Sequence, residues 1–219
     1  MKKCIVVSDS FKGTLSSLDI CAAARRVIPE CFPGCEAVTI PVADGGEGTV
    51  DCFIEAMGAS PVTVEVTGVL GTPVAARYAR LGGLAVVEMA AAAGLPLAGG
   101  TRSPGRATTF GVGELIAHAV RAGCTTVLLG LGGSATNDGG CGCAAALGVR
   151  FFDGSGAEFV PVGDTLRDIA HIDVSAAREL LRGVELKLMC DVTNPLCGEK
   201  GAAPVFGPQQ GADAADIRR

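Results

Sequence analysis

The stretch GLGGSATNDGG at residues 130–140 combines five glycines with side chains suited to phosphate oxygens or a hydrated metal ion. It follows an apolar run at residues 125–129, which predicts a buried strand, and precedes a small-residue run at 141–147, which predicts a helix. A strand, a glycine loop and a helix in this order direct backbone N–H groups at an anion. We therefore expect a binding loop for a phosphorylated ligand, because a plain surface turn needs fewer polar groups. The cofactor-binding candidates are Gly132, Gly133, Ser134, Thr136, Asn137 and Gly139.

Three further polar segments follow predicted strands in the same way. They are residues 8–14 after a strand at 4–8, residues 41–49 after a strand at 37–42, and residues 190–198 after a strand at 184–189. In α/β proteins, ligands bind beyond the carboxyl ends of parallel strands. Four polar segments in matching positions therefore predict one shared site.

Side chains in these segments supply the groups that phosphoryl transfer needs. Lys12 and Lys200 are the two lysines in strand-end segments, and either can pair with a phosphate or a substrate carboxylate. Asp191 follows an apolar strand directly, where a side chain is exposed yet rigidly held; a turn-forming role is the alternative. Positioning, charge neutralisation and a base for the acceptor hydroxyl are thus all provided. The remaining candidates are Asp44, Asp138, Arg102 and Arg106.

Two other nucleotide-binding motifs fit the sequence less well. A P-loop requires Gly-Lys followed by Ser or Thr, and the chain contains no Gly-Lys dipeptide. The pattern Gly130-x-Gly132-x-x-Ala135 resembles a dinucleotide fingerprint, with Asp153 where a ribose-binding acid would lie. Glycines at 139 and 140 disfavour an early helix start, so the helix is predicted to begin late, after a longer loop. A nicotinamide-dependent oxidoreductase is the alternative function.

Composition narrows the class of protein. The chain has 219 residues, a net charge of −5 and no basic cluster, which argues against a nucleic-acid partner. No apolar run reaches the length of a membrane span, and the N-terminal run is too short for a signal peptide. Ten cysteines without a Cys-x-x-Cys pair, and only two histidines, favour reduced thiols over a zinc site. We expect a cytoplasmic protein without a membrane partner, and homo-oligomerisation is left open.

Strands and helices alternate along most of the chain, which predicts an α/β fold with a mostly parallel, helix-flanked sheet. Alternating Val62, Val64 and Val66, turn residues at 68–73 and a strand at 74–81 predict a hairpin, followed by a strand at 84–89. This antiparallel region interrupts the α/β pattern. The predicted helices are 18–28, 48–57, 112–122 and 176–181, and a strand is expected at 149–152. The predicted domains are residues 1–59 with 106–219, a Rossmann-like region carrying the glycine loop, and residues 60–105, an antiparallel insertion belonging to a second α/β domain.

Six segments occur in a characteristic order across nearly the whole chain. They read DSFKGTLS at residues 9–16, PVADGGEGT at 41–49, EMAAAAGL at 88–95, TTFGVGELI at 108–116, GGSATNDGG at 132–140 and CDVTNPL at 190–196. Together they resemble the signature blocks of bacterial type I glycerate kinases. The resemblance implies a two-domain α/β kinase that uses ATP and Mg²⁺ to phosphorylate D-glycerate, typically at the 2-hydroxyl.

The resemblance also suggests roles for individual residues. Lys12 pairs with the glycerate carboxylate or the transferring phosphate, while Asp191 orients and deprotonates the acceptor hydroxyl or binds Mg²⁺. The loop at 132–140 holds the ATP phosphates, with Asp138 near the metal and Asp44 as a second metal or substrate ligand. Arg102 and Arg106 are an alternative clamp for the substrate carboxylate, with plain surface arginines as the competing interpretation.

Two features depart from the family pattern. Gln210 lies in PQQGA at residues 208–212, where the family commonly has a lysine. Family members also continue well beyond this length, so residues 1–219 are expected to correspond to their N-terminal part and to turn over glycerate slowly. A binding fragment without catalysis is a third functional hypothesis. Because the strands at 4–8 and 184–189 are apolar on both faces, the chain is also expected to expose an apolar patch.

Overall fold

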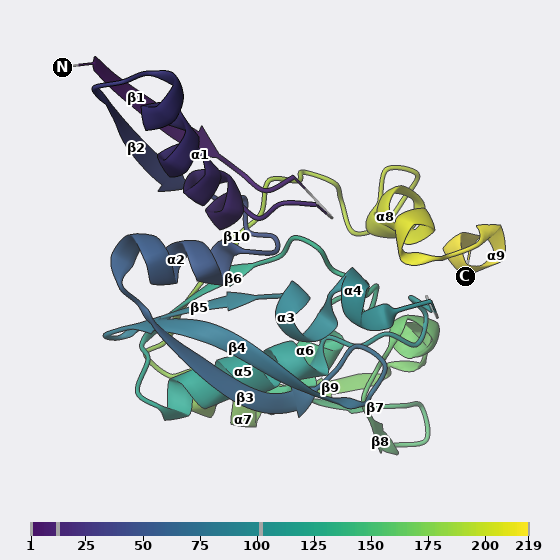
Figure 1. The fold of residues 1–219 in the computed structure, drawn as a ribbon. Helices are drawn as coiled ribbons and strands as arrows, with labels where there is room; N and C mark the ends of the chain where they lie inside the picture. Colours follow the sequence, from purple (N-terminus) through teal and green to yellow (C-terminus); the bar gives the residue numbers. More distant parts are fainter. Residues whose placement is uncertain (1, 12–13, 101–102, 219) are drawn as a thin grey trace.

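Three β-sheets with their covering helices form the computed structural model, which describes residues 2–11, 14–100 and 103–218 (Figure 1). The strands are β1 (Lys2–Ser8), β2 (Cys35–Pro41), β3 (Ser60–Thr67), β4 (Pro73–Leu81), β5 (Leu84–Glu88), β6 (Thr126–Gly130), β7 (Arg150–Phe152), β8 (Glu158–Phe159), β9 (His171–Asp173) and β10 (Glu185–Met189). The helices are α1 (Ser17–Cys31), α2 (Thr49–Met57), α3 (Ala90–Ala93), α4 (Leu95–Ala98), α5 (Phe110–Arg121), α6 (Cys141–Ala146), α7 (Ser175–Leu180), α8 (Ala202–Gln210) and α9 (Ala214–Arg218), with a 3₁₀ turn η1 (Gly163–Asp168).

The largest sheet has five strands in the order β10-β6-β5-β4-β3. β10, β6 and β5 pair in parallel, whereas β4 and β3 run antiparallel to their neighbours. The β3–β4 connection is a tight turn, in which the Gly68 N–H donates to the Thr72 carbonyl at 2.7 Å and Gly71 takes a positive φ of 88°. Glycine suits that position because it has no Cβ to clash. The predicted hairpin and the mostly parallel α/β fold are confirmed.

Helices cover both faces of this sheet. Alternate residues of β5 point to opposite sides, as the strand period of two requires. Val87 packs in the main hydrophobic cluster with Leu115 of α5, whereas Val86 packs with Val50 of α2 on the other face. Strand β5 is therefore buried on both faces, which fixes the position of the residues that follow its carboxyl end.

β1 and β2 form a separate parallel pair with α1 packed against them, and this lobe projects beyond the five-stranded sheet (Figure 1). Ser16 caps α1 in a capping box, since its Oγ accepts from the Asp19 N–H at 3.0 Å and the Asp19 carboxylate accepts from the Ser16 N–H. Ile5 and Val7 of β1 are 61% and 57% exposed. Among the described residues, β1 therefore keeps one apolar face open, and Leu188 of β10 is 57% exposed in the same way.

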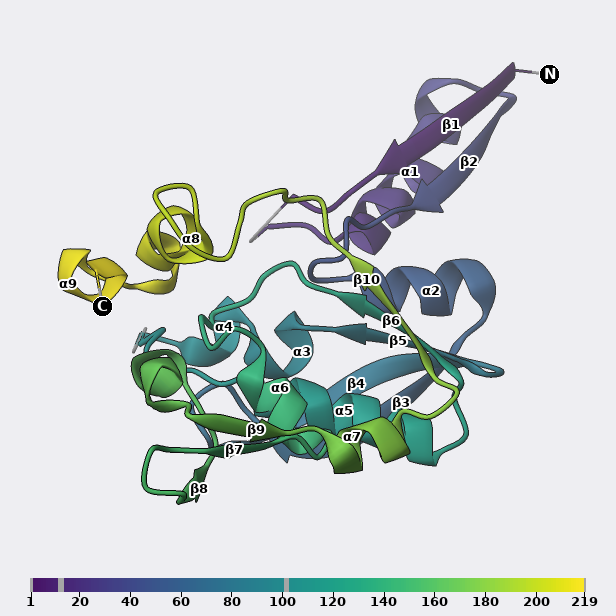
Figure 2. The ribbon, with the colours of Figure 1, turned by 180° about the vertical axis from the view of Figure 1, so that it is seen from behind.

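The C-terminal third contains elements that the sequence pattern did not indicate. The strand expected at 149–152 is β7, but it belongs to a small antiparallel sheet, β8-β7-β9, rather than to the parallel one. After β10 the chain runs outward to α8 and α9, on the side away from the N-terminus (Figure 2). Among residues 2–11, 14–100 and 103–218, no helix has the length and apolar composition that a membrane span requires.

Strand pairing groups the chain differently from the predicted domains. β3, β4 and β5, from residues 60–105, share one sheet with β6 and β10, which flank the glycine loop. The lobe at β1 and β2 has its own sheet. The predicted boundaries at 59 and 105 stay a prediction.

Candidate active site

The glycine loop at residues 130–140 leaves the carboxyl end of β6 and reaches α6 after ten residues of irregular backbone. Gly133, Gly139 and Gly140 have positive φ angles of 74°, 60° and 76°. A residue with a Cβ is strained in that region, so these glycines permit the loop's path. Gly140 is the residue before α6, so the helix starts late, as predicted.

The segment at 41–49 lies directly against this loop. The Gly132 N–H donates to the Gly45 carbonyl at 3.1 Å. A Cβ on Gly130 would lie 2.2 Å from the Gly45 carbonyl oxygen, and a Cβ on Gly132 would lie 2.7 Å from the Gly46 Cα. Only glycine fits these positions, because real Cβ atoms do not approach backbone atoms so closely. The two strand-end segments therefore meet through their backbones.

The other two predicted segments join at the same edge. The Leu131 N–H donates to the Met189 carbonyl at 3.2 Å, which places the start of residues 190–198 beside the glycine loop. Ser17 connects the first two segments, since its buried Oγ donates to the Ser8 carbonyl at 2.7 Å and accepts from the Val42 N–H at 3.1 Å. All four strand ends are therefore linked in one chain of hydrogen bonds, the first two of them through the Ser17 side chain.

A fifth segment, residues 88–95, completes the edge. The Met89 N–H donates to the Gly130 carbonyl at 2.8 Å, and the Leu95 N–H donates to the Gly133 carbonyl at 3.0 Å. The Ala135 N–H in turn donates to the Ala93 carbonyl at 2.9 Å. These bonds hold the glycine loop at three points, so its shape is set by its neighbours as well as by its own glycines.

A cavity of about 250 Å³ lies between the first and second segments. Its polar lining residues are Ser10, Thr14, Ser16, Ser17, Glu47 and Asp51. Hydroxyl and carboxylate groups of this kind bind small hydroxylated molecules. The cavity is thus a candidate pocket for a small organic substrate next to the glycine loop.

The other predicted site residues are distributed around this edge. Asp44 is exposed, and its carboxylate accepts from the Gly46 N–H at 2.9 Å. Asp191 is exposed two residues after β10, and Arg106 is exposed in the turn before α5. Lys12 and Arg102, the remaining predicted substrate contacts, lie outside the described residues.

Asp138 is the most buried polar group of the glycine loop, with 1% of its surface exposed. Its Oδ2 accepts from the Thr109 N–H and Oγ1 at 2.8 Å each and from the Gly142 N–H at 3.2 Å. Its Oδ1 accepts from the Gly140 N–H at 3.0 Å. Three of these donors bond to Oδ2 and one to Oδ1, so four hydrogen bonds from the protein anchor the carboxylate. The metal role stays a prediction, and the geometry favours a role in joining the first turns of α5 and α6.

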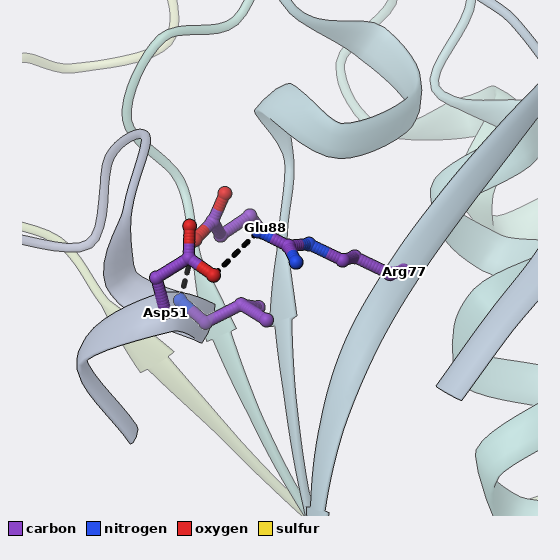
Figure 3. Close-up of polar contacts among 4 residues, drawn as sticks. Asp51, Arg77 and Glu88 are labelled. Carbon is purple, nitrogen blue, oxygen red and sulfur yellow. Dashed lines mark hydrogen bonds and ion pairs between the residues drawn. The ribbon is translucent and has the colours of Figure 1, made fainter. Parts of the chain in front are cut away.

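Glu88, at the carboxyl end of β5, is a buried acid that the list of candidates did not include. It is 9% exposed, and its carboxylate accepts from the Val50 N–H in the first turn of α2. Figure 3 shows Glu88 and Arg77 pointing toward this turn, where Asp51 forms an ion pair with Arg77. A carboxylate at a helix N-terminus satisfies an otherwise unpaired N–H group. Glu88 thus fixes the helix that follows the segment at 41–49.

Burial raises the pKa of Glu88 above its ordinary value of 4.5, mainly because desolvation disfavours the charged form. The N–H groups of Val50 and Gly48 oppose this rise in the pKa by stabilising the carboxylate. Asp51 raises the pKa further by charge repulsion, and Arg77 lowers it by attraction. Residues 84–88 form an apolar strand that ends in a single acid, and this pattern is the sequence signal that would have identified Glu88.

The dinucleotide interpretation lacks its expected structural context. That motif places the ribose-binding acid at the end of a neighbouring parallel strand. Asp153 instead follows β7 in the small antiparallel sheet, and its Oδ1 accepts from the Ser155 N–H at 2.8 Å and the Ala157 N–H at 3.0 Å. Hydrogen bonds to Ser155 and Ala157 lower the pKa of Asp153, as expected for an acid engaged in its own turn.

Comparison with known families decides between the remaining interpretations. A model described as "Glycerate kinase family" matches residues 4–219. The chain belongs to the glycerate kinase family. No comparison favours the nicotinamide-dependent alternative, and the resemblance inferred from the six segments is confirmed.

Named relatives of this family cover almost the entire chain. It is 49% identical to glycerate kinase of Bacillus subtilis (strain 168) over 97% of this chain and 56% of that protein. It is 42% identical to glycerate 2-kinase of Escherichia coli (strain K12) over 98% of this chain and 57% of that protein. The crystal structure of a protein assigned as glycerate kinase 2 from Salmonella typhimurium LT2 matches with a TM-score of 0.86 at 43% identity, over 99% of this chain and 59% of that one. The chain therefore spans a little over half the length of these relatives.

The four hydrogen bonds of Asp138 predict a large effect on stability. Asp138→Ala leaves the Thr109 and Gly142 N–H groups and the Thr109 hydroxyl without their acceptor in a buried place, each costing roughly 1–3 kcal/mol. We expect a loss of about 3 kcal/mol or more in the free energy of unfolding, measured by urea denaturation. Asp153→Ala is the control, since it also removes an acceptor of several donors, but at an exposed turn where water replaces them. Similar losses in both variants would contradict a special role of Asp138.

The raised pKa of Glu88 predicts how stability changes with pH. Because the folded protein holds this proton to higher pH than the unfolded chain, the contribution of Glu88 to stability falls as pH rises above its unfolded pKa. Glu88→Gln keeps an acceptor for Val50 but does not titrate. The stability of this variant relative to the parent protein should therefore increase as pH rises above about 4. Glu55→Gln is the control, because it removes a half-exposed carboxylate from α2, the helix whose first turn Glu88 contacts. A pH-independent difference for Glu88→Gln would refute the interpretation.

Proposed function

We propose that the glycine loop at 132–140 binds the phosphates of ATP and that the protein transfers the γ-phosphoryl group to the 2-hydroxyl of D-glycerate. The observation that carries this proposal is that the segment at 41–49 and the end of β10 meet the glycine loop through direct backbone contacts, while Ser17 links the segment at 8–14 to the one at 41–49. Membership of the glycerate kinase family supports the choice of reaction. The activity belongs to the relatives' full length, of which this chain covers a little over half.

Asp191 is the proposed base for the acceptor hydroxyl. It is exposed just beyond β10, and the end of that strand is bonded to the start of the glycine loop through Leu131 and Met189. As the hydroxyl oxygen bonds to the γ-phosphorus, the bond from that phosphorus to the leaving oxygen of ADP breaks, and the hydroxyl proton passes to the Asp191 carboxylate. The strand fixes the backbone of this residue close to the loop that would hold the nucleotide.

The substrate carboxylate needs cationic partners, which lysine and arginine side chains can supply. Lys12, Arg102 and Arg106 are the proposed partners, and Arg106 is exposed in the turn before α5. Asp44 is the proposed partner for a substrate hydroxyl. The cavity of about 250 Å³ between the first two segments is large enough for a three-carbon acid.

Mg²⁺ is the proposed counter-ion of the nucleotide. Within the part of the chain that the structure describes, no group of three or more His, Cys, Asp or Glu side chains is arranged to hold a metal ion. Mg²⁺ bound with a nucleotide takes most of its ligands from phosphate and water, with one or two carboxylates from the protein. Exposed Asp191 and Asp44 fit that requirement, whereas Asp138 is buried and accepts four hydrogen bonds from the protein. When bound, the ion would neutralise phosphate charge.

The cytoplasm is the proposed location of the protein. ATP and organic acids are available there, and the ten cysteines, which are all unpaired, suit a reducing compartment. An acidic chain without a basic cluster also fits a small-molecule enzyme better than a nucleic-acid binder.

Turnover by an Asp191→Asn variant tests the proposed base. ATP-dependent phosphorylation of D-glycerate should fall by roughly 10²–10⁴-fold in kcat, because the amide cannot accept the hydroxyl proton. The measurement is a coupled ADP-release assay in a chain with the relatives' full length, with ³¹P NMR to identify 2-phosphoglycerate. Glu199→Gln, which changes an exposed acid directly after the same segment, is the control and should keep its rate within a few-fold. If the kcat of Asp191→Asn is close to that of the parent protein, Asp191 is not the base and has only a turn-forming role.

Gly133→Ala tests the proposed phosphate loop. The added Cβ would be strained at the positive φ of 74° and would lie 3.2 Å from the Ala90 Cβ, on a surface that must approach an anion closely. ATP–Mg²⁺ affinity, measured by calorimetry in a chain that binds ATP, should drop by about ten-fold or more. Gly156→Ala, at a positive φ of 85° with open space around it, is the matched control for backbone strain. Equal ATP affinity in the two variants would show that the loop only connects β6 to α6.

A further inference from the structure

Gln210, the last residue of α8, buries a fully hydrogen-bonded amide against the glycine loop. Only 7% of its surface is exposed. Its Nε2 donates to the Thr136 carbonyl at 3.1 Å and the Ser134 carbonyl at 3.3 Å, and its Oε1 accepts from the Asn137 Nδ2 at 3.2 Å. The two carbonyls can only accept, so the amide nitrogen must face them and the orientation of the side chain is fixed.

The chain between β10 and Gln210 begins and ends on the same glycine loop. At its start, the Met189 carbonyl accepts from the Leu131 N–H at 3.2 Å. At its end, Gln210 binds residues 134–137. We call residues 190–201 the strap; it carries the proposed base Asp191 and runs outward from β10 to α8 (Figure 2). The strap is thus closed at both ends on the loop proposed to hold the nucleotide.

Apolar packing does little to hold α8 in place. Among the described residues, none of the three hydrophobic core clusters includes a residue of α8. Residues 190–200 are exposed throughout, and the strap is ordered by bonds such as Ala202 N–H to the Leu196 carbonyl at 3.2 Å. Gly211 ends the helix with a positive φ of 99°, and Gly207 and Gln210 are the buried residues of α8. The amide of Gln210 is therefore a main attachment of the strap's far end.

We propose that Gln210 is a positioning residue that couples the conformation of the glycine loop to the docking of the strap. Its amide nitrogen bonds to the Ser134 and Thr136 carbonyls and so keeps them pointing toward Gln210. Carbonyl oxygens that pointed toward the ligand would repel an anion. By the same bonds it holds the end of the strap against the loop. This inference rests on the proposed function for the identity of the anion, a nucleotide phosphate, but the docking itself does not depend on it.

Tryptic cleavage measures strap docking without any ligand. Lys200 is the only lysine or arginine between Lys187 and Arg218, and the following Gly201 is buried at the start of α8, so the rate of cleavage at this bond reports how firmly α8 is docked. Gln210→Met keeps the side-chain length but loses all three hydrogen bonds, and Gln210→Glu loses both donations. Cleavage of each variant should be about ten-fold faster than that of the parent protein. Gln209→Met is the matched control, since that neighbouring side chain is exposed and water can replace its contacts. Unchanged cleavage in Gln210→Met would overturn the docking role.

ATP–Mg²⁺ binding measures the coupling to the loop. Because linkage is reciprocal, ATP–Mg²⁺ should slow cleavage at Lys200 in the parent protein, and this protection should be lost in Gln210→Met. In a full-length chain the KM for ATP should rise about ten-fold in Gln210→Glu with a smaller change in kcat. Faster cleavage without any change in ATP affinity or KM would overturn the positioning role, whereas a merely structural residue would change only the unfolding midpoint.

The outcomes separate this inference from the proposed function. If a chain with the relatives' full length binds no ATP, the proposed function fails, and the cleavage rates of the two Gln210 variants still decide whether the amide docks the strap. Should Gln210→Met not fold, slower deuterium exchange of the backbone amides at 202–211 on addition of ATP–Mg²⁺ to the parent protein supports the coupling. Exchange that does not respond to bound ATP overturns it.

Discussion

The peptides of Gly45 and Gly46 lie against those of Gly130 and Gly132, closer than any side chain would allow. This contact joins the segment after β2 to the loop after β6, which belong to different sheets. Gly130 and Gly132 are required for it, because a Cβ on either residue would meet backbone atoms of Gly45 or Gly46 within 3 Å. The position of the β1–β2 lobe relative to the five-stranded sheet depends on this backbone contact, and with it the pocket between the first two segments.

Two buried carboxylates stabilise the elements around that contact. Glu88 binds the first turn of α2, and Asp138 binds the first turns of α5 and α6. Both act where helices begin and unpaired N–H groups would otherwise be buried. They differ in their surroundings, because desolvation raises the pKa of Glu88 while Asp138 is held by four donors. Acidic residues near a glycine loop can therefore serve the scaffold as well as a ligand.

Gln210 extends the same principle to the C-terminal segment. A neutral amide is both donor and acceptor, so one side chain satisfies two carbonyls and the Asn137 amide together. The buried carboxylates of Glu88 and Asp138 bind the first turns of helices, whereas the amide of Gln210, at the end of α8, binds the glycine loop. The loop is thus bonded to β5, β10, the segment at 41–49 and α8, which restricts its conformations before any ligand arrives.

The sequence by itself determined the type and order of most elements, because strand and helix periods, glycine turns and the Ser16 cap are local properties. It also determined that residues 41–49 and 130–140 follow strands, and its six segments indicated the family. Tertiary structure alone decided which of the acidic and amide side chains are buried: Glu88 and Gln210 gained partners 38 and 73–76 residues away in the chain. It also decided that β7 lies outside the parallel sheet and that Asp138 faces α5. Strand pairing and burial depend on residues distant in sequence, and local periodicity carries no information about them.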